Sequence, residues 1–162
     1  YTTPQQRAAY VEQVLERLRS VPGVTAAGVT TALPFFESSI SSSLPFTIEG
    51  EARPPDGDET TAFYTVAAND YFGALGVPLL SGRLFTQFDR AGAPLVIVIN
   101  ETMAKRFFPD QDPIGKKIVV RGSSRGQSAP TPSEIVGVVG DLSFTSGQSR
   151  MQCFQLLARL QQ

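Results

Sequence analysis

Hydrophobic residues near the start of the chain recur with the spacing of an α-helix. The apolar side chains fall at i, i+3, i+4 and i+7 and form one stripe, namely Val11, Val14, Leu15 and Leu18. Pro4 suits the first position of a helix, because its fixed backbone angle is already helical. The pattern predicts a helix over residues 4–19 that packs on a sheet. A lever that leaves a membrane span just upstream is the functional alternative.

Runs of β-branched, small and aromatic residues predict strands farther along the chain. These runs are residues 24–33, 46–49, 60–68, 118–120 and 134–139. Residues 95–99 (LVIVI) are apolar at every position, which predicts a strand that is covered on both faces. The segments rich in Ser, Gly, Pro and charge predict loops, at residues 37–43, 50–59 and 121–133.

Short helices are expected between some of these strands. Asn69 and Asp70 are predicted to cap a helix over residues 71–75, and Asn100 is predicted to cap a helix that ends at Phe107 or Phe108. Residues 81–83 read as a turn in which Gly82 adopts a backbone angle that other residues resist. Residues 150–162 suit a modest helix. Together the elements predict an α+β (mixed α/β) fold with partly antiparallel sheets.

Composition and charge exclude several classes of function. The apolar fraction of 41% permits a sizeable core, and the formal net charge of -1 gives no basic field for nucleic acid. The chain contains no histidine, which removes the usual acid/base group at neutral pH and the commonest metal ligand. Its single cysteine, Cys153, cannot form an internal disulfide. No run reaches the roughly 18 to 20 apolar residues of a membrane span.

Motifs with possible chemistry fail on their surroundings. Residues 122–126 match G-x-S-x-G, but they lie in an expected loop and no histidine can take the serine proton. Residues 115–117 resemble the end of a P-loop. That pattern requires Gly at position 110 and Ser or Thr at position 117, where this chain has Asp110 and Lys117. Four acids could in principle gather around a hard cation, although turn capping explains each more simply: Asp89, Asp110, Asp112 and Asp141. We therefore assign no catalytic, cofactor-binding or metal-binding residue, and expect no enzyme. A hydrolase with paired carboxylates stays the alternative within enzymes.

Four ordered blocks carry a resemblance to a known family. Residues 69–83 (NDYFGALGVPLLSGR) begin the series, and residues 98–109 (VINETMAKRFFP), 112–118 (DPIGKKI) and 134–141 (EIVGVVGD) follow at compatible spacing. Together they resemble the MacB-like periplasmic core domain of ABC transporter permeases. The predicted helix and strand of residues 4–33 also fit the N-terminal part of that family.

The resemblance implies a function outside the cytoplasmic membrane. Such a domain lies between two membrane helices of a permease, which works as a homodimer with a second permease subunit and with cytoplasmic ABC ATPase domains. It transmits ATP-driven conformational change and contacts substrate or partner proteins during export. An adaptor or an outer-membrane channel is a further candidate partner. The alternative is an extracytoplasmic domain that senses or binds a small ligand in a cleft.

The resemblance also implies two lobes. Residues 1–45 and about 119–162 would form a porter-like α/β lobe, and residues from about 46 to 118 a smaller inserted α/β lobe. The resemblance ends near Asp141, where residues 150–154 replace the strand that usually returns to the porter lobe. We therefore expect that lobe to be incomplete in this chain.

Overall fold

One sheet joins most of the described elements. The computed structural model describes residues 4–31, 42–50, 60–89, 92–122, 131–142 and 151–156. The helices in these ranges are α1 (Pro4–Arg19), α2 (Tyr71–Ala74) and α3 (Glu101–Phe107). The strands are β1 (Gly28–Thr30), β2 (Ser42–Ile48), β3 (Thr61–Asn69), β4 (Leu79–Gly82), β5 (Val96–Asn100), β6 (Lys117–Val120), β7 (Ser133–Val139) and β8 (Gln152–Leu156). This arrangement confirms the mixed α+β class.

The strand pairings close on themselves. The order β3-β2-β6-β7-β5-β8 returns to β3, because β8 pairs with both β5 and β3. The β3–β8 and β5–β7 pairs are parallel, whereas the other pairs of this ring are antiparallel. β1 pairs with β3 and β4 pairs with β7, each beside the ring. The result is a small closed ring of six strands with two short strands attached.

Alternating side chains of the ring fill two cores. All six strands of the ring contribute to the first core, so it occupies the interior. Its most buried members include Ile97, Ile99, Ile118, Ile135 and Cys153. The second core lies on the opposite face of β5, β7 and β8, under α2 and the segment that contains Leu84 and Phe85. Burial of both faces explains why β5 is buried throughout, which confirms the prediction for residues 96–99 of the apolar run 95–99.

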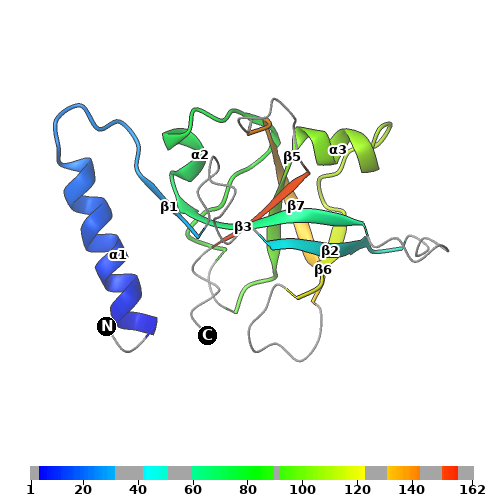
Figure 1. Cartoon of the computed structure of the whole chain (residues 1–162), viewed down its shortest axis with the longest axis horizontal. Coiled ribbons are helices and arrows are strands. Elements are labelled where there is room, and N and C mark those ends of the chain that lie inside the picture. Colours follow the sequence, from blue (N-terminus) through cyan, green and yellow to red (C-terminus); the bar gives the residue numbers. More distant parts are fainter. Residues whose placement is uncertain are drawn as a thin grey trace.

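Helix α1 stands to one side of the sheet, and α3 lies at the other side (Figure 1). Leu15 of the predicted apolar stripe is 1% exposed, so the stripe is buried at this position. Leu18 is 45% exposed and Val21, just beyond the helix, is 49% exposed. The apolar stripe of α1 is therefore covered over only part of its length in the described structure.

Helix α2 reaches the sheet through a close backbone contact. A Cβ atom at Gly28 of β1 would collide with the backbone of Tyr71, the first residue of α2. Tyr71 and Phe72 are buried, and both rings lie against Phe154 of β8. The predicted side-chain cap of this helix is wrong, because Asp70 makes no capping hydrogen bond. Packing on β1 and β8 holds α2 instead.

Several strand boundaries differ from those expected. β2 begins at Ser42, inside the expected loop of residues 37–43, because residues 42–45 pair with β3. The strand expected at residues 24–33 is confirmed only at Gly28–Thr30. The turn expected at residues 81–83 is the end of β4, although Gly82 has the expected positive φ of 72°. The rest of the serine-rich loop, and most of the loops at 50–59 and 121–133, lie outside the described residues.

The largest correction concerns the C-terminal segment. A helix was expected over residues 150–162, but Gln152–Leu156 forms strand β8 and completes the ring. Residues 157–162 lie outside the described part. The apolar spacing of Met151 and Phe154 fits a helix, yet the pairing partners on β3 and β5 decide the outcome.

The expected division into two lobes stays a prediction. Strands from both expected parts pair with one another in the described sheet, for example β2 with β6 and β5 with β7.

Removal of a buried aromatic side chain from β8 tests the placement of this strand. Phe154 is fully buried, and its ring lies 5.0 Å from that of Phe72, centre to centre, in an edge-on arrangement. Phe154→Ala should lower the free energy of unfolding by about 3–5 kcal/mol in urea titrations. Phe88→Ala is the matched control, because Phe88 is 73% exposed, and should change it by less than about 0.5 kcal/mol. Equal costs for the two substitutions would contradict the strand.

Candidate functional site

The four acids considered from sequence do not come together. No group of three or more Asp, Glu or Cys side chains that could hold a metal occurs among the described residues. Asp112 accepts from the backbone N–H of Ile114 at 3.0 Å and stabilises its own turn, as expected. Asp110 is exposed after α3. Asp89 and Asp141 each belong to a separate polar cluster.

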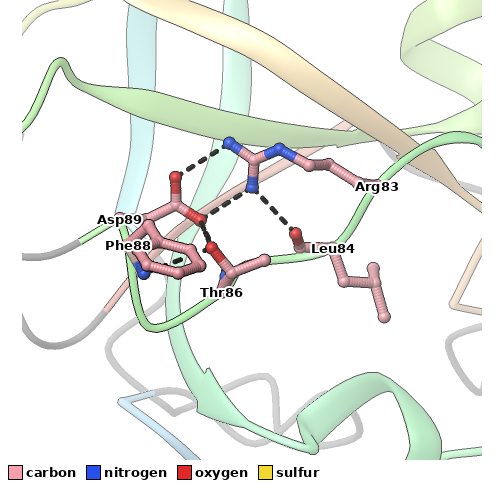
Figure 2. Close-up of polar contacts among 5 residues, drawn as sticks. All are labelled: Arg83, Leu84, Thr86, Phe88 and Asp89. Atoms are coloured by element: carbon pink, nitrogen blue, oxygen red, sulfur yellow. Dashed lines mark hydrogen bonds and ion pairs between the residues drawn. The ribbon is translucent and has the colours of Figure 1, made fainter.

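The first cluster, which we name the Arg83–Asp89 clasp, consists of Arg83, Thr86 and Asp89 (Figure 2). The Arg83 guanidinium donates from Nη1 to Asp89 Oδ2 at 2.7 Å and from Nη2 to Asp89 Oδ1 at 2.8 Å. Thr86 donates to Asp89 Oδ2 from its backbone N–H at 2.7 Å and from its hydroxyl at 3.1 Å. The clasp closes the short segment that follows β4 into a loop.

The clasp shifts the pKa of both its charged groups. Hydrogen bonds from Arg83 hold the pKa of the Asp89 carboxyl below its ordinary value, against the opposing effect of burial. The same pair raises the pKa of Arg83. The Asp89 side chain is 6% exposed while that of Arg83 is 46% exposed, so the acid is enclosed and the base still meets solvent.

Phe88 lies inside the loop that the clasp closes. Its side chain is 73% exposed, the highest value among the large apolar residues described. Its backbone N–H donates to the Thr86 hydroxyl at 3.3 Å, so the main chain that carries the aromatic side chain is held in place (Figure 2). An exposed aromatic side chain on a fixed backbone can bind a partner at a low cost in conformational entropy.

The second cluster, which we name the Asn100 hub, consists of Asn100, Thr102, Asp141 and the backbone of Met103 and Gln152. Asn100 is fully buried and caps α3 as the sequence predicts, because its Oδ1 accepts from Met103 N at 3.2 Å. The same oxygen accepts from Gln152 N at 2.9 Å, while Nδ2 donates to Asp141 Oδ1 at 2.6 Å. The hub therefore joins α3 to the ends of β5, β7 and β8.

Sequence reasoning singled out Asn100, Asp89 and Asp141 but did not identify the residues that they contact. The cap at Asn100 follows from its position before a helix, a local signal. The contacts of Asn100 with Asp141 and Gln152 span 41 and 52 positions of sequence, and no local pattern reports them. The Arg83–Asp89 pair spans only six positions, and opposite charges at this spacing were the available signal. Of the G-x-S-x-G motif, only Gly122 is described.

Solved structures of transporter domains share this fold. The periplasmic region of MacB from Actinobacillus actinomycetemcomitans superposes with a TM-score of 0.59 at 21% identity, over 91% of this chain and 55% of that chain. The extracellular domain of the noncanonic ABC-type transporter YknZ from Gram-positive bacteria gives a TM-score of 0.55 at 19% identity, over 90% and 61%. The fold is thus that of the extracytoplasmic domains of ABC-type transporters.

Sequence comparison then establishes the family. The chain belongs to the MacB-like periplasmic core domain family, whose model matches residues 2–159. It is 32% identical over 85 residues to the macrolide export ATP-binding/permease protein MacB of Neisseria gonorrhoeae. The aligned region covers 52% of this chain and 13% of that protein. A MacB of Aggregatibacter actinomycetemcomitans is 31% identical over 71 residues, or 44% and 10%. The chain thus spans about a tenth of the length of these relatives.

Family membership confirms the predicted location and coarse function. The chain is an extracytoplasmic domain of a MacB-like ABC transporter permease. The family match continues well past Asp141, where the expected resemblance ended, and includes β8. No helix within the described ranges has the length and apolar character to cross a membrane.

The ionisation of Asp89 predicts a pH-dependent contribution of the clasp to stability. The folded-state pKa lies below the unfolded one, so the stabilisation is present above the unfolded value, near pH 4, and is lost as pH falls through the folded value. Asp89→Asn should lower the free energy of unfolding by about 1–2 kcal/mol at neutral pH. The difference from the unsubstituted chain should shrink in urea titrations at progressively lower pH.

The control for this measurement is Asp112→Asn. Its side-chain oxygen can still accept from Ile114 N, and the residue is exposed, so the cost should stay below about 0.5 kcal/mol. A cost of Asp89→Asn that is the same at every pH would contradict the role of its charge.

Proposed function

We propose that this domain transmits ATP-driven conformational change within an ABC export permease and contacts partner proteins on the extracytoplasmic side. The permease would act as a homodimer, in which a second permease subunit contributes an equivalent domain. The ATPase activity would lie in a separate cytoplasmic domain. The domain itself would catalyse no chemical reaction.

The closed ring of strands is the observation that supports this proposal best. A domain that passes on a displacement must keep its shape while it moves, and a closed ring leaves its strands paired along both edges over much of their length. Its interior is filled by side chains from all six strands, and such packed cores resist continuous deformation. The ring is thus suited to move as one body.

Helix α1 and Phe88 offer surfaces through which other parts of the permease or partner proteins could contact the ring. α1 stands beside the ring (Figure 1), and part of its apolar stripe stays exposed at Leu18. Phe88 is displayed on the loop that the Arg83–Asp89 clasp fixes (Figure 2). Either surface supports a protein contact, with the second subunit, an adaptor or an outer-membrane channel as candidate partners.

Distance measurements in the full-length permease test the transmission. A spin label at Gln111→Cys, an exposed position beyond α3, reports the separation of the two copies of the domain by electron–electron double resonance. We expect the distance distribution to shift by several ångström between the nucleotide-free state and an ATP-bound state in which hydrolysis is blocked. The buried Cys153 should take no label, because burial raises the pKa of its thiol to about 12.

A second label pair provides the internal control. Labels at Gln87→Cys and Gln111→Cys within one subunit, diluted with unlabelled subunits, should keep a constant distance in both states, since the ring moves as one body. An unchanged distance between the two copies in a permease that still hydrolyses ATP would rule out transmission by this domain. A change within one copy would show that the loop after β4 and the segment beyond α3 shift relative to each other, so that the domain does not move as one body.

A further inference from the structure

The side chain of Asn100 continues the contact between β5 and β8 beyond the last backbone pair of their ladder. Ile97, Val98 and Ile99 stand opposite Gln155, Phe154 and Cys153, which places Asn100 opposite Gln152 at the next step. At this point β5 turns into α3, and Asn100 Oδ1 accepts from Gln152 N at 2.9 Å. The side-chain amide thus extends the contact between the two strands by one residue.

The same oxygen also holds the first turn of α3. Asn100 Oδ1 accepts from Met103 N at 3.2 Å, so one buried atom binds both a helix amide and a strand amide. A rotation of this side chain away from its position would break both hydrogen bonds at once. α3 and β8 therefore share one hydrogen-bond acceptor, Asn100 Oδ1.

Asp141 fixes the orientation of the Asn100 amide. Its Oδ1 accepts from Asn100 Nδ2 at 2.6 Å and from Thr102 N at 2.9 Å, and its Oδ2 accepts from the Thr102 hydroxyl at 2.6 Å. A carboxylate can only accept here, so it selects the rotamer in which Nδ2 faces it and Oδ1 faces the two backbone N–H groups. Asp141 is thus a positioning residue for Asn100.

The side chain of Gln152, the first residue of β8, acts against the pairing of this strand. Gln152 is 3% exposed, and its Oε1 is a buried acceptor without a hydrogen-bond partner in the described structure. An unsatisfied buried acceptor destabilises the conformation in which β8 is paired, because water could reach the acceptor if β8 separated from its neighbours. The backbone hydrogen bond to Asn100 therefore holds this residue in place against the preference of its own side chain.

We propose that the Asn100 hub is a latch that couples α3 to β8, so that the two elements are held together and are released together. Its significance for transmission rests on the proposed function, since a latched α3 would follow the ring and a released α3 would not. The coupling itself is a property of the chain and is measurable without a membrane.

The lone cysteine supplies a site-specific readout of β8. Cys153 follows Gln152 directly and is fully buried, so a thiol reagent can modify it only when β8 opens. Amide hydrogen exchange over residues 101–107 reports α3 in the same sample. Asn100→Ala should accelerate both processes by about tenfold or more, because it removes buried hydrogen bonds to both elements.

Val120→Ala is the matched control. Val120 lies in β6, in the same interior core and away from the hub, and its truncation lowers global stability without touching Asn100. Global stability of each variant is measured by urea titration. The latch is supported when Asn100→Ala accelerates Cys153 modification beyond the rate that its global stability allows, while Val120→Ala does not.

The inference is overturned if Asn100→Ala accelerates exchange in α3 while Cys153 modification stays at the rate set by global unfolding. Asn100 would then be a helix cap alone. Should Asn100→Ala fail to fold, Asp141→Ala removes the group that orients Asn100 and must show the same joint acceleration. Failure of this test leaves the spin-label experiment unaffected, because that experiment follows the whole domain.

Discussion

Strand β8 is the element on which the rest of the structure depends. It inserts between β3 and β5, parallel to the first and antiparallel to the second, and thereby closes the ring. Without it, β3 and β5 would each present an unpaired edge in the middle of the sheet, which proteins normally avoid. It also places Cys153 in the interior core and Phe154 in the outer core, so both cores are completed by neighbouring residues. β8 therefore completes both the backbone ladder and the two cores.

Closure leaves polar groups at the ends of the strands, and two carboxylates satisfy them. Asp89 gathers donors from Arg83 and Thr86 at the end of β4, and Asp141 gathers donors from Asn100 and Thr102 beyond β7. Both acids lie where the sheet gives way to loops or a helix, and there the backbone has lost its regular partners. The hydrogen bonds of both acids go to neighbouring donors, so each carboxylate stabilises the local structure at its strand end.

Local signals made part of this fold predictable from the sequence. The apolar run at β5, the cap at Asn100 and the helix that follows were all predicted, because each depends on residues a few positions apart. β8 was not, since a five-residue strand has too little pattern of its own and takes its conformation from partners far away in the sequence. The connections of Asn100 were missed for the same reason. The family was predictable because four motif blocks stand in order along the chain. They cover α2 with β4, the end of β5 with α3, the turn before β6, and most of β7.

The contrast between the ring and α1 bears on how a displacement would pass through the domain. The ring is held by backbone pairing around its whole circuit and by two filled cores. α1 stands apart from it (Figure 1), and of its apolar stripe only Leu15 is fully buried while Leu18 stays half in solvent. A weakly attached helix can change its angle to a rigid body at low cost, whereas the body itself deforms only at the cost of its core packing. Under the proposed function, motion between α1 and the ring would disturb less core packing than motion within the ring.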